Sequence, residues 1–216
     1  MSLSPPTRWI STFMITRLLI ILASPYLVAA PVLQAARITP AEAGTYFHLS
    51  PFTTDDRKEL PPEQFAELVG ELSKQFPEKR WVISCAPTER ERRKMEVLLP
   101  LLPVLPWRVF AGKLNLVQLA AVIRHSALHL CGDTGTLHLA LMTGARSVAW
   151  FWPNPGMQIW VPIGPSHRTL VGINKPEVDY LCDIETAGLV SAVTSILCEP
   201  PSPAPEPGRE IPHKKN

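Results

Sequence analysis

The chain alternates between short apolar runs and longer amphipathic segments. The apolar runs carry no Asp, Glu, Lys or Arg, which is typical of strands buried on both faces of a parallel sheet. These runs are Tyr46–Ser50, Trp81–Cys85, Val109–Ala111, Ala127–Cys131, Ser147–Trp152 and Thr169–Ile173. Helical patterns lie between them, at Glu63–Gln75, within Ala86–Glu96, from Asn115 or Leu116, after Gly132, and at Ile184–Cys198. The alternation predicts an α/β fold, a Rossmann-like parallel sheet with helices on both faces.

Two of the predicted helices have a defined apolar face. In the helix over Glu63–Gln75 this face consists of Phe65, Leu68, Val69 and Leu72. In the helix that opens at Asn115 or Leu116 the inward residues are Leu119, Ala120, Val122 and Ile123. The prolines between Leu98 and Trp107 predict a connecting segment there rather than a helix.

The segment from Ala127 to Gly144 contains the strongest candidate for a ligand site. Its strand ends at a turn formed by Gly132 and Asp133, Asp133 or Thr134 can cap the helix that follows, and Gly144 ends that helix. With the next strand, this makes one βαβ unit. The polar residues of the turn lie at the carboxyl end of a strand, where open α/β sheets bind their ligands.

The turn before this helix has the features of an anion site. The first N–H groups of a helix lack intrahelical partners and lie at the positive end of its dipole, so a phosphate can accept from Thr134, Gly135 and Thr136. Gly135 allows close approach, and His138, one turn beyond Thr134, can reach the same oxygens. In the alternative interpretation Asp133 caps the helix, Gly135 relieves the turn and His138 is a partly buried helix residue. Neither a G-x-G-x-x-G fingerprint nor a Walker lysine is present.

The triplet Asp133, Thr134 and Gly135 also occurs at the catalytic aspartate of retropepsin-like and pepsin-like proteases. Those sites lie in all-β folds, where two aspartates share a proton. In this chain the triplet opens a helix within alternating strands and helices. A protease is therefore the weaker interpretation.

The loop after the strand Tyr46–Ser50 is a second candidate for phosphate binding. Thr53 and Thr54 offer hydroxyl groups, and Lys58 offers a cation just before the next helix. A solvated polar loop without ligand is the alternative. The sequence thus supplies two polar loops, each following a predicted buried strand.

Composition limits the classes of protein to be considered. With 216 residues, 46% of them apolar, the chain can bury one core but not two full nucleotide-binding domains. The net charge of +2, without basic residues interleaved with aromatics, gives no indication of nucleic acid as a partner. The cysteines form no C-x-x-C pair, so they predict neither zinc nor a disulfide scaffold and fit a reducing compartment. They are Cys85, Cys131, Cys182 and Cys198.

Both ends of the chain differ from the middle. Residues 1–45 form a hydrophobic segment whose uncharged run of 19 residues, Leu18–Ala36, is long enough to span a bilayer. Pro25 and Pro31 interrupt this run, and signal peptide, membrane anchor and linker helix are the alternatives. We favour a linker helix or a peripheral membrane contact. Residues 199–216 are Pro-rich and polar and are predicted to be disordered, which leaves residues 46–198 as the folded domain.

Two separated motifs resemble glycosyltransferase family 9, the lipopolysaccharide heptosyltransferases. The first is TTDDRKELPPEQF, from Thr53, and the second is LNLVQLAAVIRHSALHLCGDTGTLHLALMTGARSVAWFWP, from Leu114. The likeness covers about Tyr46 to Cys198 and is to the carboxyl-terminal half of the family. One departure is Leu60, which stands where the family's Lys-x-Trp-Pro has tryptophan. This change affects a packing contact more than the phosphate chemistry.

The resemblance implies one half of a GT-B architecture, in which two Rossmann-like domains face each other and the carboxyl-terminal one holds a nucleotide sugar. The implied donor is an ADP-activated heptose, used as substrate without a further cofactor or metal, and the implied acceptor is the lipopolysaccharide core. By carry-over, Lys58 neutralises the diphosphate as leaving-group stabiliser, and Thr53 and Thr54 hydrogen-bond it. Asp133, Thr134, Gly135, Thr136 and His138 complete the nucleotide-sugar site. The implied location is the cytoplasm, including the inner face of the inner membrane.

The resemblance also implies an acceptor domain and an aspartate that acts as general base, neither of which this sequence supplies. Residues 1–45 contain Glu42 as their only carboxylate. Two functions therefore stay open: a glycosyltransferase completed by a partner chain, and a truncated, non-catalytic module that binds nucleotide sugars. A sugar-nucleotide epimerase is weaker because its catalytic carboxylates have no candidates. The sequence leaves open the donor sugar, the acceptor and the oligomeric state.

Overall fold

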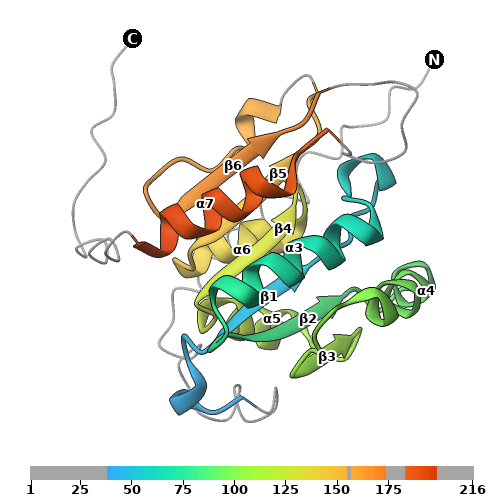
Figure 1. Ribbon diagram of the computed structural model, residues 1–216, viewed down its shortest axis with the longest axis vertical. Coiled ribbons are helices and arrows are strands. Elements are labelled where there is room, and N and C mark those ends of the chain that lie inside the picture. Colours follow the sequence, from blue (N-terminus) through green and yellow to red (C-terminus); the bar gives the residue numbers. More distant parts are fainter. Residues whose placement is uncertain (1–37, 155–156, 174–182, 199–216) are drawn as a thin grey trace, which may run out of the picture.

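Six parallel strands form one sheet in the order β3-β2-β1-β4-β5-β6 (Figure 1). The computed structural model describes residues 38–154, 157–173 and 183–198. The predictions made for residues 1–37 and 199–216 lie outside these ranges. The strands are β1 (Tyr46–Ser50), β2 (Arg80–Cys85), β3 (Arg108–Ala111), β4 (Leu128–Gly132), β5 (Ser147–Phe151) and β6 (His167–Val171).

Helices cover both faces of this sheet. They are α3 (Pro62–Gln75), α4 (Glu89–Leu98), α5 (Leu116–Arg124), α6 (Gly135–Thr143) and α7 (Thr186–Cys198). Short 3-10 turns are η2 (Pro40–Glu42), η3 (Asp56–Lys58), η4 (Leu99–Leu101) and η5 (Met157–Ile159). In Figure 1, α3 and α7 lie in front of the sheet, and α5 and α6 lie behind it. The predicted α/β fold with a parallel sheet covered on both faces is confirmed.

The buried face of α3 matches the sequence pattern. Phe65, Leu68, Val69 and Leu72 are all buried, and they pack with α7 and one face of the strands in the larger core cluster. At α5 the four residues predicted to face inward all pack on the core, but to different depths. Ala120 to Ile123 are buried, whereas Leu119 is only half-buried. The difference arises because α5 packs on α6 as well as on the sheet, so its buried face includes Ala121 and leaves Leu119 on a groove.

Helix caps follow the predicted chemistry in two places. Asn115 caps α5, with its side chain accepting from Gln118 N–H at 2.9 Å. Gly144 ends α6 with a φ of 69°, in the left-handed region that glycine adopts at low cost. The strand β6 begins at His167, earlier than predicted, because His167 and Arg168 pair with the start of β5.

The strand order reverses between β1 and β4. From β1 the chain proceeds outward to β2 and β3, and it then returns to place β4 on the other side of β1. At such a switch point the loops that follow the two central strands diverge and leave a crevice at the carboxyl edge of the sheet, where ligands of doubly wound folds bind. The two loops here are those that begin at Pro51 and Asp133, the same two that the sequence singled out.

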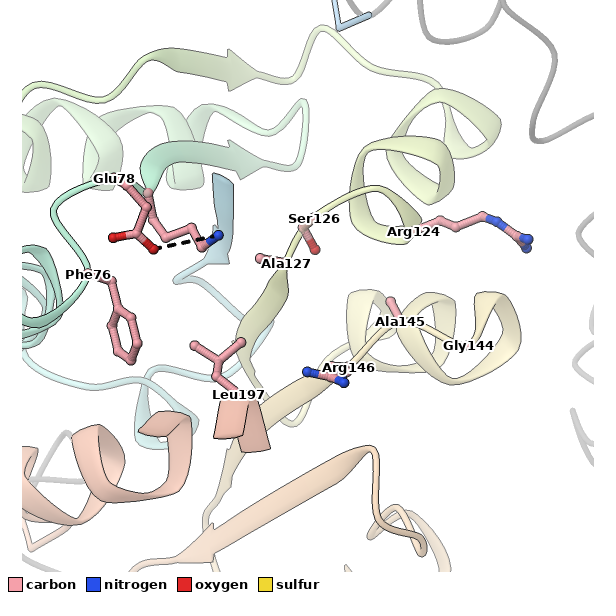
Figure 2. Close-up of a pocket in the computed structure, with 10 residues that line it drawn as sticks. Phe76, Glu78, Arg124, Ser126, Ala127, Gly144, Ala145, Arg146 and Leu197 are labelled. Carbon is pink, nitrogen blue, oxygen red and sulfur yellow. Dashed lines mark ion pairs between the residues drawn. The ribbon is translucent and has the colours of Figure 1, made fainter. Parts of the chain in front are cut away.

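The opposite edge of the sheet has a pocket of another kind, with a volume of about 490 Å³ (Figure 2). Two of its cations donate to backbone carbonyl groups at helix ends: Arg124 donates to Thr143 O at 3.5 Å, and Arg146 donates to Ile196 O at 3.3 Å. Thr143 and Ile196 are in the last turns of α6 and α7, so these guanidinium groups complement helix carboxyl ends. The third cation of the lining, Lys79, pairs with Glu78 at 3.7 Å and donates to Gly44 O at 3.0 Å (Figure 2).

Within the described ranges, no helix has both the length and the apolar character needed to cross a membrane.

Candidate functional site

Lys58 and Asp133 join the two loops at the switch point. The Lys58 ammonium donates to the Asp133 carboxylate with an Nζ to Oδ2 distance of 2.5 Å, across 75 positions of sequence. Their side chains are 25% and 14% exposed. The pair therefore fixes a cation next to the amino end of α6.

The amino end of α6 is open to a ligand. Thr134 occupies the N-cap position with extended backbone, but its side chain makes no capping hydrogen bond. The Asp133 carboxylate, the other predicted cap, is engaged by Lys58. Gly135 is exposed, and a Cβ added there would meet nothing within 4 Å. The first turn of α6 thus offers backbone N–H groups at the positive end of the helix, the arrangement that suits an anion.

Two adjoining pockets flank this helix end. The first has a volume of about 300 Å³, lies beside the ends of β1 and β2, and includes the polar residues Ser50, Ser84, Thr134 and Thr136. The second has a volume of about 590 Å³ and a mainly apolar wall. That wall includes Leu116, Leu119, Leu139, Leu141, Met142 and Trp160. Since Thr134 and Thr136 line both, the helix end separates a compartment of mixed character, which holds the two serines, from a mainly apolar one.

His138 faces the apolar pocket. Its ring packs edge-on against Trp160, with 5.3 Å between ring centroids. Trp160 belongs to the loop after β5 and is 51% exposed. The sequence placed His138 on the same helical face as Thr134, and both residues do line this pocket.

The predicted threonine pair divides into two environments. Thr53 is 2% exposed, and its hydroxyl donates to Asp55 O at 2.7 Å and accepts from Asp55 N–H at 3.1 Å. Thr54 is exposed. The Thr53 hydroxyl therefore shapes its own loop. Contact of either threonine with a diphosphate stays a prediction.

Glu59 anchors the loop that carries Lys58, a role that the sequence analysis missed. One carboxylate oxygen accepts from Thr53 N–H at 2.8 Å, and the other accepts from the Lys94 ammonium at 2.6 Å. Arg90 donates to Thr53 O at 2.7 Å from the same helix, α4. Burial raises the pKa of Glu59, and the bonds to Lys94 and Thr53 oppose that rise. The loop is thus held at several points before any ligand arrives.

A buried polar chain was also missed. His48 and His129 lie side by side on β1 and β4, with 2.9 Å between their Nδ1 atoms. His48 Nε2 is 3.0 Å from Ser84 Oγ, and His129 Nε2 is 3.2 Å from Thr136 Oγ1. The partner of a histidine in a buried strand can be identified only when the neighbouring strand is known. The hydrophobic periodicity of the sequence could therefore not have predicted this set of hydrogen bonds.

Gly132 is packed against both loops of the site. A Cβ at this position would lie 2.9 Å from Lys58 O, 2.9 Å from Trp150 Nε1 and 3.0 Å from Thr53 Cγ2. Real Cβ contacts are longer than these, so Gly132→Ala is expected to push the Lys58 loop away and to destabilise the fold by about 1–3 kcal/mol, as overpacking does. Urea unfolding of Gly132→Ala and Gly135→Ala measures this effect. Equal stability of the two variants would contradict the packing argument, because Gly135 has open space.

Residues 24–187 match glycosyltransferase family 9 (heptosyltransferase). This is most of the chain. The protein is a member of glycosyltransferase family 9. No protein with curated annotation matches the sequence.

Solved structures of family 9 members have the same fold. A family 9 glycosyltransferase from Veillonella parvula aligns over 81% of this chain and 52% of its own, with 16% identity and a TM-score of 0.66. The E. coli ADP-heptose lipopolysaccharide heptosyltransferase II aligns over 77% and 50%, with 18% identity and a TM-score of 0.58. E. coli heptosyltransferase WaaC, solved with ADP, aligns over 76% and 48%, with 18% identity and a TM-score of 0.61. This family 9 chain therefore spans about half the length of the solved structures that it matches.

Proposed function

We propose that this family 9 chain is the donor-binding half of a glycosyltransferase of the heptosyltransferase kind. In this proposal it binds an ADP-activated sugar, a heptose by resemblance, which is transferred to a lipopolysaccharide core acceptor. The observation that carries the proposal is the meeting of Lys58, Asp133 and the open amino end of α6 at the switch point. The WaaC structures, solved with ADP-2-deoxy-2-fluoro heptose and with ADP, support the choice of nucleotide.

The chemistry assigned to the site is stabilisation of a leaving group. As the bond between sugar and diphosphate breaks, negative charge grows on the diphosphate. The Lys58 ammonium and the N–H groups at the start of α6 are fixed donors, so they bind this growing charge more strongly than the ground state and lower the barrier. The apolar pocket beside Trp160 gives the adenine ring a surface on which to pack.

The acceptor side is assigned to another part of the enzyme. An inverting transfer needs a base within hydrogen-bond reach of the acceptor hydroxyl, and we assign no residue of this chain to that role. A facing Rossmann-like domain, in the same polypeptide or in a partner chain, would supply the base and the acceptor site. A glycolipid acceptor would place the reaction at the cytoplasmic face of a membrane.

Calorimetric titration of the full chain with ADP, UDP and GDP tests the proposal. Selective binding of ADP is the expected result. A folded protein that binds none of the three would remove the nucleotide site, and a preference for UDP or GDP would reassign the donor.

Replacing Lys58 with Ala is expected to weaken ADP binding about 10-fold or more. A charge-assisted hydrogen bond contributes about 1.5–3 kcal/mol, and the change also leaves the Asp133 carboxylate without its partner near the diphosphate. Isothermal titration of Lys58→Ala measures the loss. Lys113→Ala, which removes an exposed lysine from the loop after β3, is the matched control. Equal affinities of the two variants would exclude Lys58 from the site.

A further inference from the structure

Five side chains form a continuous polar chain under the phosphate end of the proposed site. In order they are Ser50, Ser84, His48, His129 and Thr136, joined by oxygen and nitrogen distances of 3.3, 3.0, 2.9 and 3.2 Å. His48 and His129 are completely buried, and the two serines are 4% exposed. The rings stack with 4.9 Å between centroids. The chain runs across β2, β1 and β4 to the first turn of α6.

Both ends of this chain of side chains reach the pocket of about 300 Å³ beside β1 and β2. Ser50 and Ser84 line it at one end, and Thr136 lines it at the other. Thr136 also contacts the Cys131 thiol, which is a weak hydrogen-bonding group compared with a phosphate. A hydrogen bond made by Thr136 in the pocket is therefore connected to the two serines, which line the same pocket, through the two rings.

Burial keeps both rings neutral. It lowers the pKa of His48 and of His129, and in His48 the neighbouring His129 lowers it further. A neutral imidazole has one N–H donor and one bare nitrogen acceptor. Because the two Nδ1 atoms bond to each other, one must donate and the other must accept, so only two arrangements are available.

The two arrangements differ in what Thr136 can do. In the first, His48 Nδ1–H donates to His129, so the His129 proton is on Nε2 and is donated to Thr136. The Thr136 hydroxyl then has its own hydrogen available for the pocket. In the second, His129 Nδ1–H donates to His48, and Thr136 must give its hydrogen to the bare His129 Nε2. Each ring keeps one proton in both arrangements, so the pair stays neutral.

We propose that His48 and His129 are positioning residues that fix Thr136 as a hydrogen-bond donor when a phosphate occupies the site. The inference rests on the proposed function, since it takes the ligand to be a nucleoside diphosphate. A phosphate oxygen can only accept, so it selects the first arrangement and excludes the second. The same choice makes Ser84 donate to His48 Nε2, so it also fixes the direction of the hydrogen bond at the serine end of the chain of side chains.

A purely structural role for the pair has a different signature. If the rings only satisfied each other within the core, their arrangement would be independent of the ligand and of the Thr136 hydroxyl. The position of the ring protons distinguishes the two roles, whereas loss of stability on mutation does not.

The proposal can be tested by NMR on the full chain labelled with ¹⁵N at histidine. Two-bond ¹H–¹⁵N spectra at pH 7, with and without ADP, show which ring nitrogen of each histidine carries the proton. Calorimetry on the same samples reports whether ADP binds. The expected ADP complex has protons on His48 Nδ1 and His129 Nε2. Bound ADP with the opposite pattern, or with charged rings, would overturn the inference and leave the proposed function intact. Absence of ADP binding would overturn both.

Thr136→Val and Thr136→Ser form a matched pair for the second arm of the test. Valine removes the hydroxyl, and a buried N–H without an acceptor is costly, so the His129 proton is expected to move to Nδ1 and to stay there when ADP is added. Serine keeps the hydroxyl, and its ADP complex is expected to show the wild-type pattern. Identical patterns in the two variants would overturn the inference.

Discussion

Gly135→Val is expected to abolish ADP binding while leaving the fold intact. A Cβ at this position would meet no atom within 4 Å outside its own helix and chain neighbours, so the first atom of a side chain has room in the ligand-free protein. The same side chain would fill the space through which a phosphate approaches the first N–H groups of α6. Calorimetric titration with ADP, together with circular dichroism, measures both effects.

The control for Gly135→Val is Gly135→Ala, which adds a single methyl group. We expect it to weaken ADP binding to a smaller extent, because the loss should scale with the volume that intrudes on the phosphate. Normal ADP affinity in a folded Gly135→Val protein would refute the site at the helix terminus.

The free energy of unfolding of this protein is expected to fall already between pH 7.5 and pH 5, above the range in which carboxylates titrate. Both buried histidines have a pKa below the ordinary value in the folded state, so the unfolded chain binds more protons as the pH falls. Their contribution to stability is complete above pH 6.5 and is lost below it. The free energy of unfolding should fall by about 1.4 kcal/mol per histidine per pH unit, or about 4 kcal/mol for the pair between pH 7.5 and pH 5.

Urea unfolding at several pH values measures this loss. Replacing His48 with Gln keeps a donor and an acceptor in the strand but removes one titrating ring, so the decline attributable to the pair should be about halved. His125 and His167 are half-buried, with pKa values lowered chiefly by burial, and they add a smaller loss in the same range. A free energy of unfolding that is constant between pH 7.5 and pH 5 would contradict the neutral buried pair.

The order and type of the elements were predictable because each apolar run is short and each helix has a clear period. The strand Tyr46–Ser50 and the buried face of α3 agree with the structure residue by residue. Leu119 packs against the core but is only half-buried, since a helical period identifies the apolar face and not how deeply each of its residues is covered. The packing of α5 on α6 is a property of the tertiary structure.

The site was predictable as two loops but not as a set of contacts. Residue types and their place after buried strands identified Lys58, Asp133 and the first turn of α6. The resemblance to family 9 then favoured a ligand-binding role for these residues over the alternative of a solvated loop. The sequence could not show that the Thr53 hydroxyl bonds within its own loop, because that contact depends on the local conformation of the loop. The contacts of Glu59 with Lys94 and of His48 with His129 depend on how α4 packs and on the order of the strands.

The anchoring of the Lys58 loop by Glu59 has an energetic consequence for any ligand of this edge. Ordering a loop costs conformational entropy. If the loop were flexible in the free protein, this cost would weaken the binding of each ligand. Here Lys94, Arg90 and the buried Glu59 carboxylate order the backbone of the loop when the protein folds. The chain therefore meets its ligand with a preorganised surface, and the affinity it can reach is limited by contact chemistry and desolvation rather than by loop closure.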